Sequence, residues 1–402
     1  MHTYQDLLRV REFRALFLGN CATVAGMTMS GLALATLVQE RTGSPLLTAL
    51  SLFGAAFASV VGSMTLMSAA DGLAPRRGLS LLAAVSALAA CVQAIPGLPV
   101  GWRIGVVVGV GYLFSIGGGL RWGLLGDLLP AESYVLGRSL MNASVGAMQI
   151  AGFGLGGLLL QWLSPTQIFA TSAALAVTAA VVLRFGLRER PARSDHRPGL
   201  RRTWVVNRQL LADPSRRALY LAMWIPNGLV VGAEALFVPY AGHSAGLLFV
   251  AGAIGMLAAD VGVGRFLKAH WRVRLAQPLQ VLLAVPYLVL FFKPGLPLVA
   301  VLVLIASVGF GASLLLQERL VELTAPEVRG QALGLHSAGQ STMQGVAAVI
   351  AGLIGEVLAI NLAMAVMAVL SLLITAGLTR GVQRAIQAGR ADTSAELVHT
   401  VT

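Results

Sequence analysis

The positively charged residues of this chain lie in alternate gaps between long apolar segments. When these segments are threaded as twelve membrane crossings with the N-terminus inside, all 29 Lys and Arg residues except Arg41, Arg103 and Lys293 lie on the cytoplasmic side. The positive-inside rule predicts this asymmetry, whereas a soluble fold gives no reason for it. The sequence therefore predicts an all-α membrane protein with twelve transmembrane helices and both termini in the cytoplasm.

A crossing needs about 20 mainly apolar residues. The run that follows Arg14 is much longer than the apolar core of a signal peptide, and further spans follow it, so we expect it to be kept as the first helix. The twelve spans are predicted near residues 15–38, 46–69, 79–96, 104–121, 139–162, 166–186, 218–241, 245–263, 277–293, 298–317, 331–355 and 361–380.

The composition indicates the partners of the chain. Charged residues make up 11% of it, against about 25% in soluble domains. The net charge of +12 is explained by arginines that face anionic lipid, so the expected partner is a lipid bilayer and not nucleic acid. Cys21 and Cys91 lie in apolar runs, and the six His residues lack metal-ligand spacing, so no metal site and no cofactor are predicted. Arg outnumbers Lys 27 to 2, which is typical of a GC-rich bacterial genome and predicts a bacterial cytoplasmic (inner) membrane location.

The longest break between spans is a basic segment that separates two groups of six spans. It contains nine Arg residues, and Trp204 lies among them as in a short amphipathic helix on a membrane surface. The predicted parts are an N-terminal six-helix bundle (1–187), a basic cytoplasmic linker (188–217), a C-terminal six-helix bundle (218–380) and a short cytoplasmic tail (381–402).

The two predicted bundles repeat each other. Three glycines of the first half recur in the second at a constant offset of 193 residues, as Gly137/Gly330, Gly146/Gly339 and Gly152/Gly345. Parallel repeats of this kind are associated with alternating access to a central site.

Two motifs indicate a family. Residues 71–77 read DGLAPRR, and residues 152–157 read GFGLGG. The first resembles the Asp-x-x-Gly-Arg-Arg loop motif of the major facilitator superfamily without its central Gly. The second resembles the Gly-Pro-x-x-Gly-Gly motif of exporters in that superfamily, with Phe153 in place of the proline. The chain is thus similar to bacterial drug and metabolite exporters. The resemblance implies a single-chain secondary transporter of a small molecule, expected to be a monomer and not an enzyme.

Glu234 is the predicted proton-coupling residue. An ionisable group inside a span costs a few kcal/mol, so it needs an explanation. Burial favours its neutral form, which suits proton exchange or binding of a cationic substrate, and Asn227 lies two helical turns below it on the same face. The alternative is an interfacial glutamate paired with Arg41 or Arg103.

Charges near one cytoplasmic loop predict a conformational latch. Asp71 with Arg76 and Arg77 would hold helix ends together in one state and separate in the other. The alternative is that the arginines only set the topology of the chain.

Uncharged polar side chains inside spans are candidates to line a cavity. They are costly in lipid and are expected to face the interior of the bundle, where they either contact substrate or hydrogen-bond neighbouring helices. The candidates are Asn20, Asn142, Gln149, Asn227, His336, Gln340 and Gln344. Gly152, Gly156 and Gly157 are expected to allow close helix packing instead.

No catalytic constellation is predicted, because the sequence has no pair of carboxylates within a span and no Gly-x-Ser-x-Gly elbow. The expected function is proton-coupled export of a small amphipathic molecule, such as an antibiotic, drug or secondary metabolite, by alternating access. The alternatives are an importer of a small metabolite and a non-transporting membrane sensor or scaffold.

Overall fold

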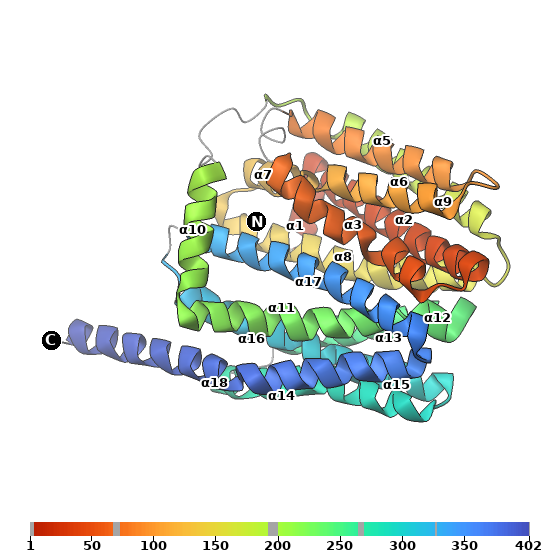
Figure 1. The fold of residues 1–402 in the computed structure, drawn as a ribbon. Coiled ribbons are helices and arrows are strands. Elements are labelled where there is room, and N and C mark those ends of the chain that lie inside the picture. Colours follow the sequence, from red (N-terminus) through yellow and green to blue (C-terminus); the bar gives the residue numbers. More distant parts are fainter. Residues whose placement is uncertain (1–3, 67–72, 192–199, 264–268, 326–327, 402) are drawn as a thin grey trace. The chain divides into compact units, whose positions relative to one another are not determined.

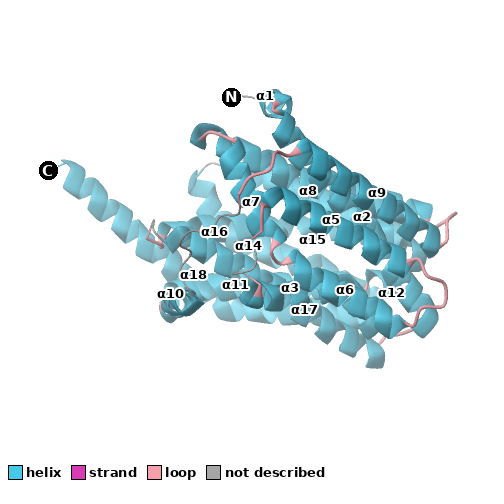
Figure 2. Ribbon diagram, turned by 90° about the horizontal axis from the view of Figure 1, so that it is seen from above, coloured by secondary structure: helices cyan, strands magenta, loops and turns pink. Residues whose placement is uncertain are grey.

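The structure, a computed structural model, describes residues 4–66, 73–191, 200–263, 269–325 and 328–401. These residues form helices joined by loops, and none of them belongs to a β-strand (Figures 1 and 2). The all-α fold that the sequence predicts is therefore confirmed for this part of the chain. The helices group into two compact units. The first contains residues 1–195 and 235–253, and the second contains residues 196–234 and 254–402.

The first unit is built on α2, which packs against α8 and α9. Its inner core gathers residues from several helices, among them Phe13, Leu124 and Leu183. The helices are α1 (Tyr4–Arg9), α2 (Arg11–Thr42), α3 (Pro45–Thr65), α5 (Pro75–Gln93), α6 (Val100–Phe114), α7 (Gly117–Leu128), α8 (Ala131–Leu159), α9 (Pro165–Gly186), α12 (Phe237–Ala241), η1 (Gly242–Ser244) and the first part of α13 (Ala245–Val261).

The second unit has a similar centre, because α11 packs between α17 and α18 (Figure 1). Its core includes Tyr220, Met223 and Leu316. Besides the last part of α13, its helices are α10 (Leu200–Ala212), α11 (Pro214–Glu234), α14 (Ala269–Leu288), η3 (Val289–Phe292), α15 (Leu296–Val308), η4 (Gly309–Gly311), α16 (Ala312–Glu322), α17 (Arg329–Val357) and α18 (Ile360–Val401).

Local sequence signals fix where two of the membrane helices begin. Ser44 caps α3 by accepting a hydrogen bond from the Leu47 amide at 3.2 Å, and Pro45 occupies the first turn. At α9, Ser164 and Gln167 form a reciprocal capping box. These caps satisfy amides that a helix leaves unpaired, which matters most where water is scarce.

Nine stretches of the described residues are long and apolar enough to cross a membrane. One of them, Pro214–Val261, has 48 residues and contains α11, α12 and α13, which the sequence predicts as two spans. α8 and α17 are absent from the nine, although each has 29 residues. Both carry the polar side chains that the sequence analysis singled out, and this lowers their hydropathy.

The predicted seventh span, 218–241, is not one continuous helix. α11 ends at Glu234 and α12 begins at Phe237, so the helix is interrupted at Ala235 and Leu236. A second break follows at Gly242, whose φ of 53° is in the region that glycine adopts without strain. The first break separates Glu234 from residues 235–253, which group with the first unit.

Two glycines of α11 allow α17 to approach its backbone. A Cβ on Gly228 would lie 2.8 Å from the carbonyl oxygen of Met343, and one on Gly232 would lie 2.6 Å from that of Ala347. The two glycines are four residues apart and therefore share a face of the helix. Small residues at this spacing drive helix association in membranes through close van der Waals contact.

Gly232→Ala is expected to destabilise the second unit. The added methyl group has no space, and overpacking typically costs about 1–3 kcal/mol. The matched control is Gly334→Ala on α17, where a Cβ meets nothing within 4 Å. This control should be neutral or slightly stabilising, because Ala favours helix over Gly. Thermal unfolding of the two purified variants checks the prediction, and equal midpoints would contradict it.

Candidate functional site

Glu234 is the last residue of α11, and its carboxylate faces a tyrosine. The hydroxyl of Tyr287 donates a hydrogen bond to Glu234 Oε1 at 3.3 Å. Tyr287, on α14, is 1% exposed, and Glu234 is half-buried. The partner that the structure provides within the second unit is thus a neutral side chain.

Arg103, the arginine that the sequence analysis paired with Glu234 as an alternative, has a role inside the first unit. Its guanidinium donates to backbone carbonyl oxygens of Gln93, Ile95 at 2.9 Å and Leu98 at 3.1 Å. The Gln93 side chain donates in return to the Arg103 carbonyl oxygen at 2.9 Å. Arg103 is 1% exposed. Its hydrogen bonds satisfy carbonyl oxygens at and just after the C-terminal end of α5, where helix carbonyls lack partners.

A proline interrupts α11 two turns before Glu234. Pro226 has no amide hydrogen, so the carbonyl of Ala222, one turn earlier, loses its helical hydrogen bond. The buried side chain of Gln280 on α14 donates to this carbonyl oxygen at 2.8 Å. Ser371 of α18 donates to the carbonyl oxygen of Pro226 at 3.1 Å. Two neighbouring helices thus stabilise the interrupted segment of α11.

Two of the predicted polar residues of the second half are bonded to each other. Gln344 of α17 donates to Asn227 Oδ1 at 3.3 Å, and Asn227 is 3% exposed. His336, two turns earlier on α17, is 4% exposed, and neither ring nitrogen makes a well-formed hydrogen bond with a described residue. Gln340 lies between them and is half-buried.

In the first unit the buried partner of Asn20 is one that the sequence analysis did not name. Asn20 Nδ2 donates to the hydroxyl of Ser144 on α8 at 3.4 Å, and Asn20 is 4% exposed. Asn142 is exposed and Gln149 is half-buried. Asn20–Ser144 joins α2 to α8, as Asn227–Gln344 joins α11 to α17, so the two units use corresponding helix pairs.

The three predicted packing glycines lie at crowded positions on α8. A Cβ on Gly152 would lie 3.0 Å from the carbonyl oxygen of Ala25, and one on Gly156 would lie 3.4 Å from the Cα of Met29. Both contacts are with α2. A Cβ on Gly157 would lie 2.8 Å from the Cα of Gly246, which is on α13 within the first unit.

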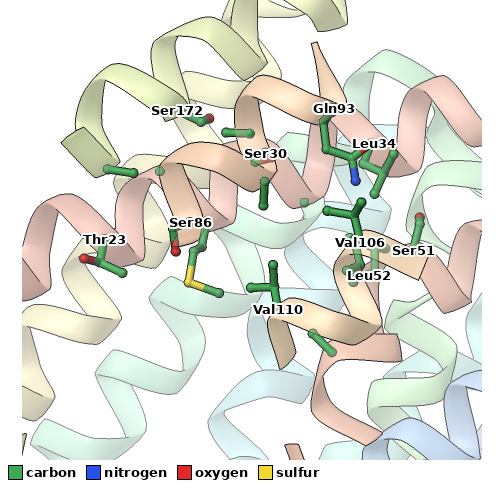
Figure 3. Close-up of a pocket in the computed structure, with 18 residues that line it drawn as sticks. Thr23, Ser30, Leu34, Ser51, Leu52, Ser86, Gln93, Val106, Val110 and Ser172 are labelled. Atoms are coloured by element: carbon green, nitrogen blue, oxygen red, sulfur yellow. The ribbon is translucent and has the colours of Figure 1, made fainter. Parts of the chain in front are cut away.

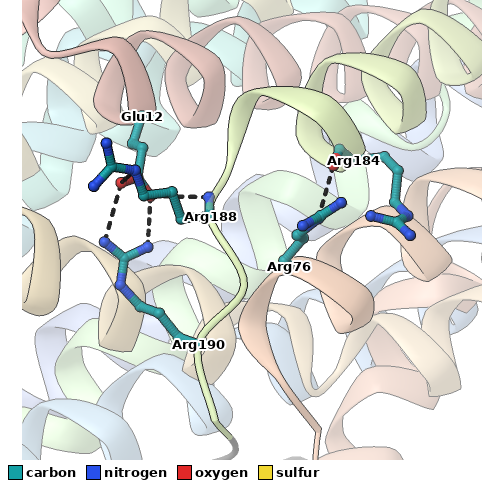
Figure 4. A network of polar contacts seen from close by, with 5 residues as sticks. All are labelled: Glu12, Arg76, Arg184, Arg188 and Arg190. Carbon is teal, nitrogen blue, oxygen red and sulfur yellow. Dashed lines mark hydrogen bonds and ion pairs between the residues drawn. The ribbon is translucent and has the colours of Figure 1, made fainter.

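Arg76 and Arg77 face an acid that follows α9. Glu189 accepts from Arg77 at 2.5 Å, and Arg76 lies 3.9 Å from the same carboxylate. Arg76 also donates to the carbonyl oxygen of Arg184 at 2.8 Å (Figure 4). Asp71, the acid that the sequence analysis assigned to this cluster, lies outside the described residues.

A second ion pair holds the same segment to α2. Glu12 accepts from both terminal nitrogens of Arg190, at 2.5 and 3.2 Å, and from the backbone amide of Arg188 at 3.2 Å (Figure 4). The hydrogen bonds that Arg190 donates to the Glu12 carboxylate raise the pKa of Arg190. The chain that leaves α9 is therefore tied to α2 and α5.

Comparison with known proteins decides the family. The family profile described as Major Facilitator Superfamily matches residues 16–312. The chain belongs to the major facilitator superfamily. It is accordingly a membrane transporter and not an enzyme, as the sequence predicted. Among curated proteins, no sequence match was found.

Solved structures share the fold of this superfamily member at low identity. The xylose transporter XylE from E. coli, in an inward open conformation, has a TM-score of 0.68 at 14% identity, covering 92% of this chain and 95% of that one. A bacterial homolog of the human lysosomal transporter Spinster has a TM-score of 0.63 at 15% identity over 94% and 93% of the two chains. The human organic anion transporter TETRAN has a TM-score of 0.61 at 17% identity over 92% and 99%.

Sequence reasoning did not identify several residues of these clusters. Pro226 signals an unpaired carbonyl at Ala222, but only the fold shows that Gln280 supplies the donor. Tyr287 lies 53 positions after Glu234 and carries no local signal. Glu189 lies in the predicted basic linker, where the sequence does not mark it as the partner of Arg77.

Gln280→Leu is expected to destabilise the protein by about 1 kcal/mol, because it leaves the Ala222 carbonyl unpaired. Pro226→Ala restores an amide hydrogen that can pair with the Ala222 carbonyl. In that background Gln280→Leu should therefore cost much less stability. A double-mutant cycle on thermal unfolding measures this coupling. Additive effects would mean that Gln280 does not serve the carbonyl that Pro226 leaves unpaired.

Glu12→Gln is expected to release the segment after α9. Loss of about 1 kcal/mol from its ion pairs should speed tryptic cleavage after Arg188 roughly fivefold. Mass spectrometry of timed digests locates the cuts. Glu40→Gln is the matched control, since Glu40 is on the same helix and pairs instead with His243 at 3.1 Å. Equal rates in the two variants would refute a role for Glu12 in holding the segment.

Proposed function

We propose that this transporter exports a small amphipathic molecule in exchange for protons, from the cytoplasm across a bacterial inner membrane. Its substrate would be an antibiotic, drug or secondary metabolite, and the protein would act as a monomer. The observation that carries the proposal is Glu234, an acid at the end of a membrane helix whose hydrogen-bond partner is the neutral Tyr287.

The position of Glu234 suits a group that takes up and releases a proton. The last carbonyls of α11 present the negative end of the helix dipole to an ionised carboxylate. Tyr287 donates one hydrogen bond to the carboxylate but adds no positive charge. A substrate or a conformational change that alters the surroundings of Glu234 would therefore change its proton occupancy. A membrane potential of 100 mV supplies about 2.3 kcal/mol for each charge moved.

Twelve crossings with both termini in the cytoplasm remain our proposal for the topology. Nine stretches of the described residues are sufficiently apolar, and the longest of them, Pro214–Val261, contains two predicted spans. α8 and α17 would supply the other two. Each has 29 residues, more than the roughly 20 that a crossing needs. Their polar side chains would face the bundle interior, as Asn227 and Gln344 do when they bond to each other.

Alternating access would move the N-terminal bundle (1–187) against the C-terminal bundle (218–380), joined by the basic linker (188–217) and followed by the tail (381–402). Residues 235–253 belong to the second predicted bundle but group with the first unit. They contact α8 at two places. The rings of Phe249 and Phe153 stack with their centroids 4.5 Å apart, and the backbones of Gly246 and Gly157 pack closely together. We propose that this contact separates when the outer side opens.

The cavity that this movement exposes would be apolar to weakly polar, which suits an amphipathic substrate. The residues proposed to line it are Asn20, Asn142, Gln149, Asn227, His336, Gln340 and Gln344. On the inner side, Arg76 and Arg77 would act in the latch, with Glu189 as their partner in the described part of the chain.

Glu234→Gln is expected to abolish proton-driven efflux. The variant and the wild type are expressed at equal levels in an efflux-deficient bacterial host, and accumulation of dyes, antibiotics and metabolites is measured with and without a protonophore. Wild type should lower accumulation, while the variant should match cells without the transporter. Glu356→Gln, which changes an exposed glutamate on α17, should behave as wild type.

Three outcomes would count against the proposal. Protonophore-insensitive efflux in wild type would remove proton coupling, and unchanged efflux by Glu234→Gln would remove Glu234 from the mechanism. Higher accumulation in wild-type cells would replace export with import of a metabolite.

A further inference from the structure

A small cavity in the first unit has a positively charged side chain in its wall. Its volume is about 30 Å³, and it lies among α2, α5, α6, α7 and α9. Arg121 of α7 is the one charged residue among the described residues that line it. Most of the others are apolar, among them Leu79, Leu82 and Phe114. The cavity therefore combines one positive charge with a largely apolar wall.

The guanidinium of Arg121 makes no hydrogen bond and no ion pair with a described residue. None of its nitrogens is fully enclosed, so they reach open space. Other arginines of the first unit do have partners. Arg103 bonds to backbone carbonyls, and Arg138 stacks on Trp122 with 5.3 Å between the guanidinium carbon and the ring centre. Arg121 lies in the apolar stretch Val100–Leu128, where a charge without a partner is costly.

The other polar groups of the wall leave the guanidinium as the group that faces the cavity. The Thr23 hydroxyl donates to the carbonyl oxygen of Gly19 at 2.8 Å. The Asn20 amide nitrogen donates to Ser144 at 3.4 Å, and Asn20 Oδ1 is fully enclosed and does not border the open space. An arginine side chain offers donors and no acceptor. A ligand in this cavity therefore has to accept hydrogen bonds.

The size of the cavity limits the ligand. A water molecule needs about 10–15 Å³, so a cavity of about 30 Å³ has room for roughly two waters or for one anion of that size. A chloride ion or a carboxylate group fits this limit, whereas a ring does not. A larger cavity of the same unit, of about 150 Å³, has no charge on the described residues that line it (Figure 3). Of these two cavities, the one beside Arg121 suits a small anion.

We infer that the cavity beside Arg121 is a binding site for a small anion, either chloride or the carboxylate group of a small acid. The anion accepts hydrogen bonds from the guanidinium and compensates its charge inside the membrane. The site belongs to the first unit, whereas Glu234 belongs to the second. The inference therefore goes beyond the proposed function and depends neither on the direction of transport nor on proton coupling.

The test is NMR of chloride with the purified full-length protein in micelles of a neutral maltoside detergent. Chloride that exchanges between the site and solution gives a broadened line, and micelles without protein give the blank. Potassium gluconate keeps the ionic strength constant, because gluconate is too large for the cavity. We expect saturable broadening in wild type. Competition by formate would show that the site also takes a carboxylate group, and no competition would restrict it to halides.

Arg121→Gln removes the charge and keeps a polar side chain. It should lower the affinity for chloride roughly tenfold or more, as the loss of a hydrogen bond to a charged group predicts. The matched control is Arg138→Gln, which removes the same charge from an exposed position on α8. This control should bind chloride as wild type does. Ala83→Leu, which fills the cavity and keeps Arg121, should abolish binding. Monodisperse elution in size-exclusion chromatography checks that each variant is folded.

Two results would overturn the inference. Absence of saturable broadening in wild type would mean that the cavity holds only water. Equal affinity of wild type and Arg121→Gln would place the bound chloride elsewhere. Glu234→Gln should bind chloride as wild type does, so a failure of the transport proposal is distinguishable from a failure of this site.

Discussion

Backbone carbonyls that lack a helical partner impose the strongest demand on this fold, because a hydrocarbon environment offers no water to satisfy them. Pro226 leaves such a carbonyl at Ala222, and the buried Gln280 reaches across from α14 to pair with it. At the end of α5, the buried Arg103 bonds to several carbonyls at once. In both places a costly polar side chain is retained inside the protein because it satisfies the main chain. The helices that carry these side chains are held at defined positions as a result.

The same reasoning explains what sequence analysis achieves here. The placement of charges and apolar runs predicts an all-helical membrane protein, because both follow from the bilayer alone. That Asn227 and Gln344 both face the bundle interior is likewise predictable in outline, since each lies on a membrane helix that must hide its polar groups. The identity of partners is different. Tyr287 meets Glu234 only through tertiary packing, and no local pattern announces the contact.

The break at Ala235 and Leu236 shows a second limit of sequence analysis. These residues are apolar, and neither is a Gly or Pro that would mark a helix end. The predicted seventh span therefore runs through them, whereas in the structure α11 stops at Glu234. α8 and α17 show the opposite case. Their polar residues lower the apolar signal, while their length and close packing against α2 and α11 place them in the cores of the units.

The acidic residues of the described chain have two kinds of partner, arginines in one place and a tyrosine in another. Glu12 and Glu189 are paired with arginines beside the chain that follows α9, where ion pairs hold a segment in position. Glu234 has a neutral partner at the end of a membrane helix, where we propose that it gains and loses a proton. Infrared difference spectroscopy of the purified transporter between acidic and alkaline pH tests this directly. The account predicts a carbonyl stretch of a protonated carboxylic acid that disappears at high pH and is missing in Glu234→Gln. The same band in both proteins would contradict it.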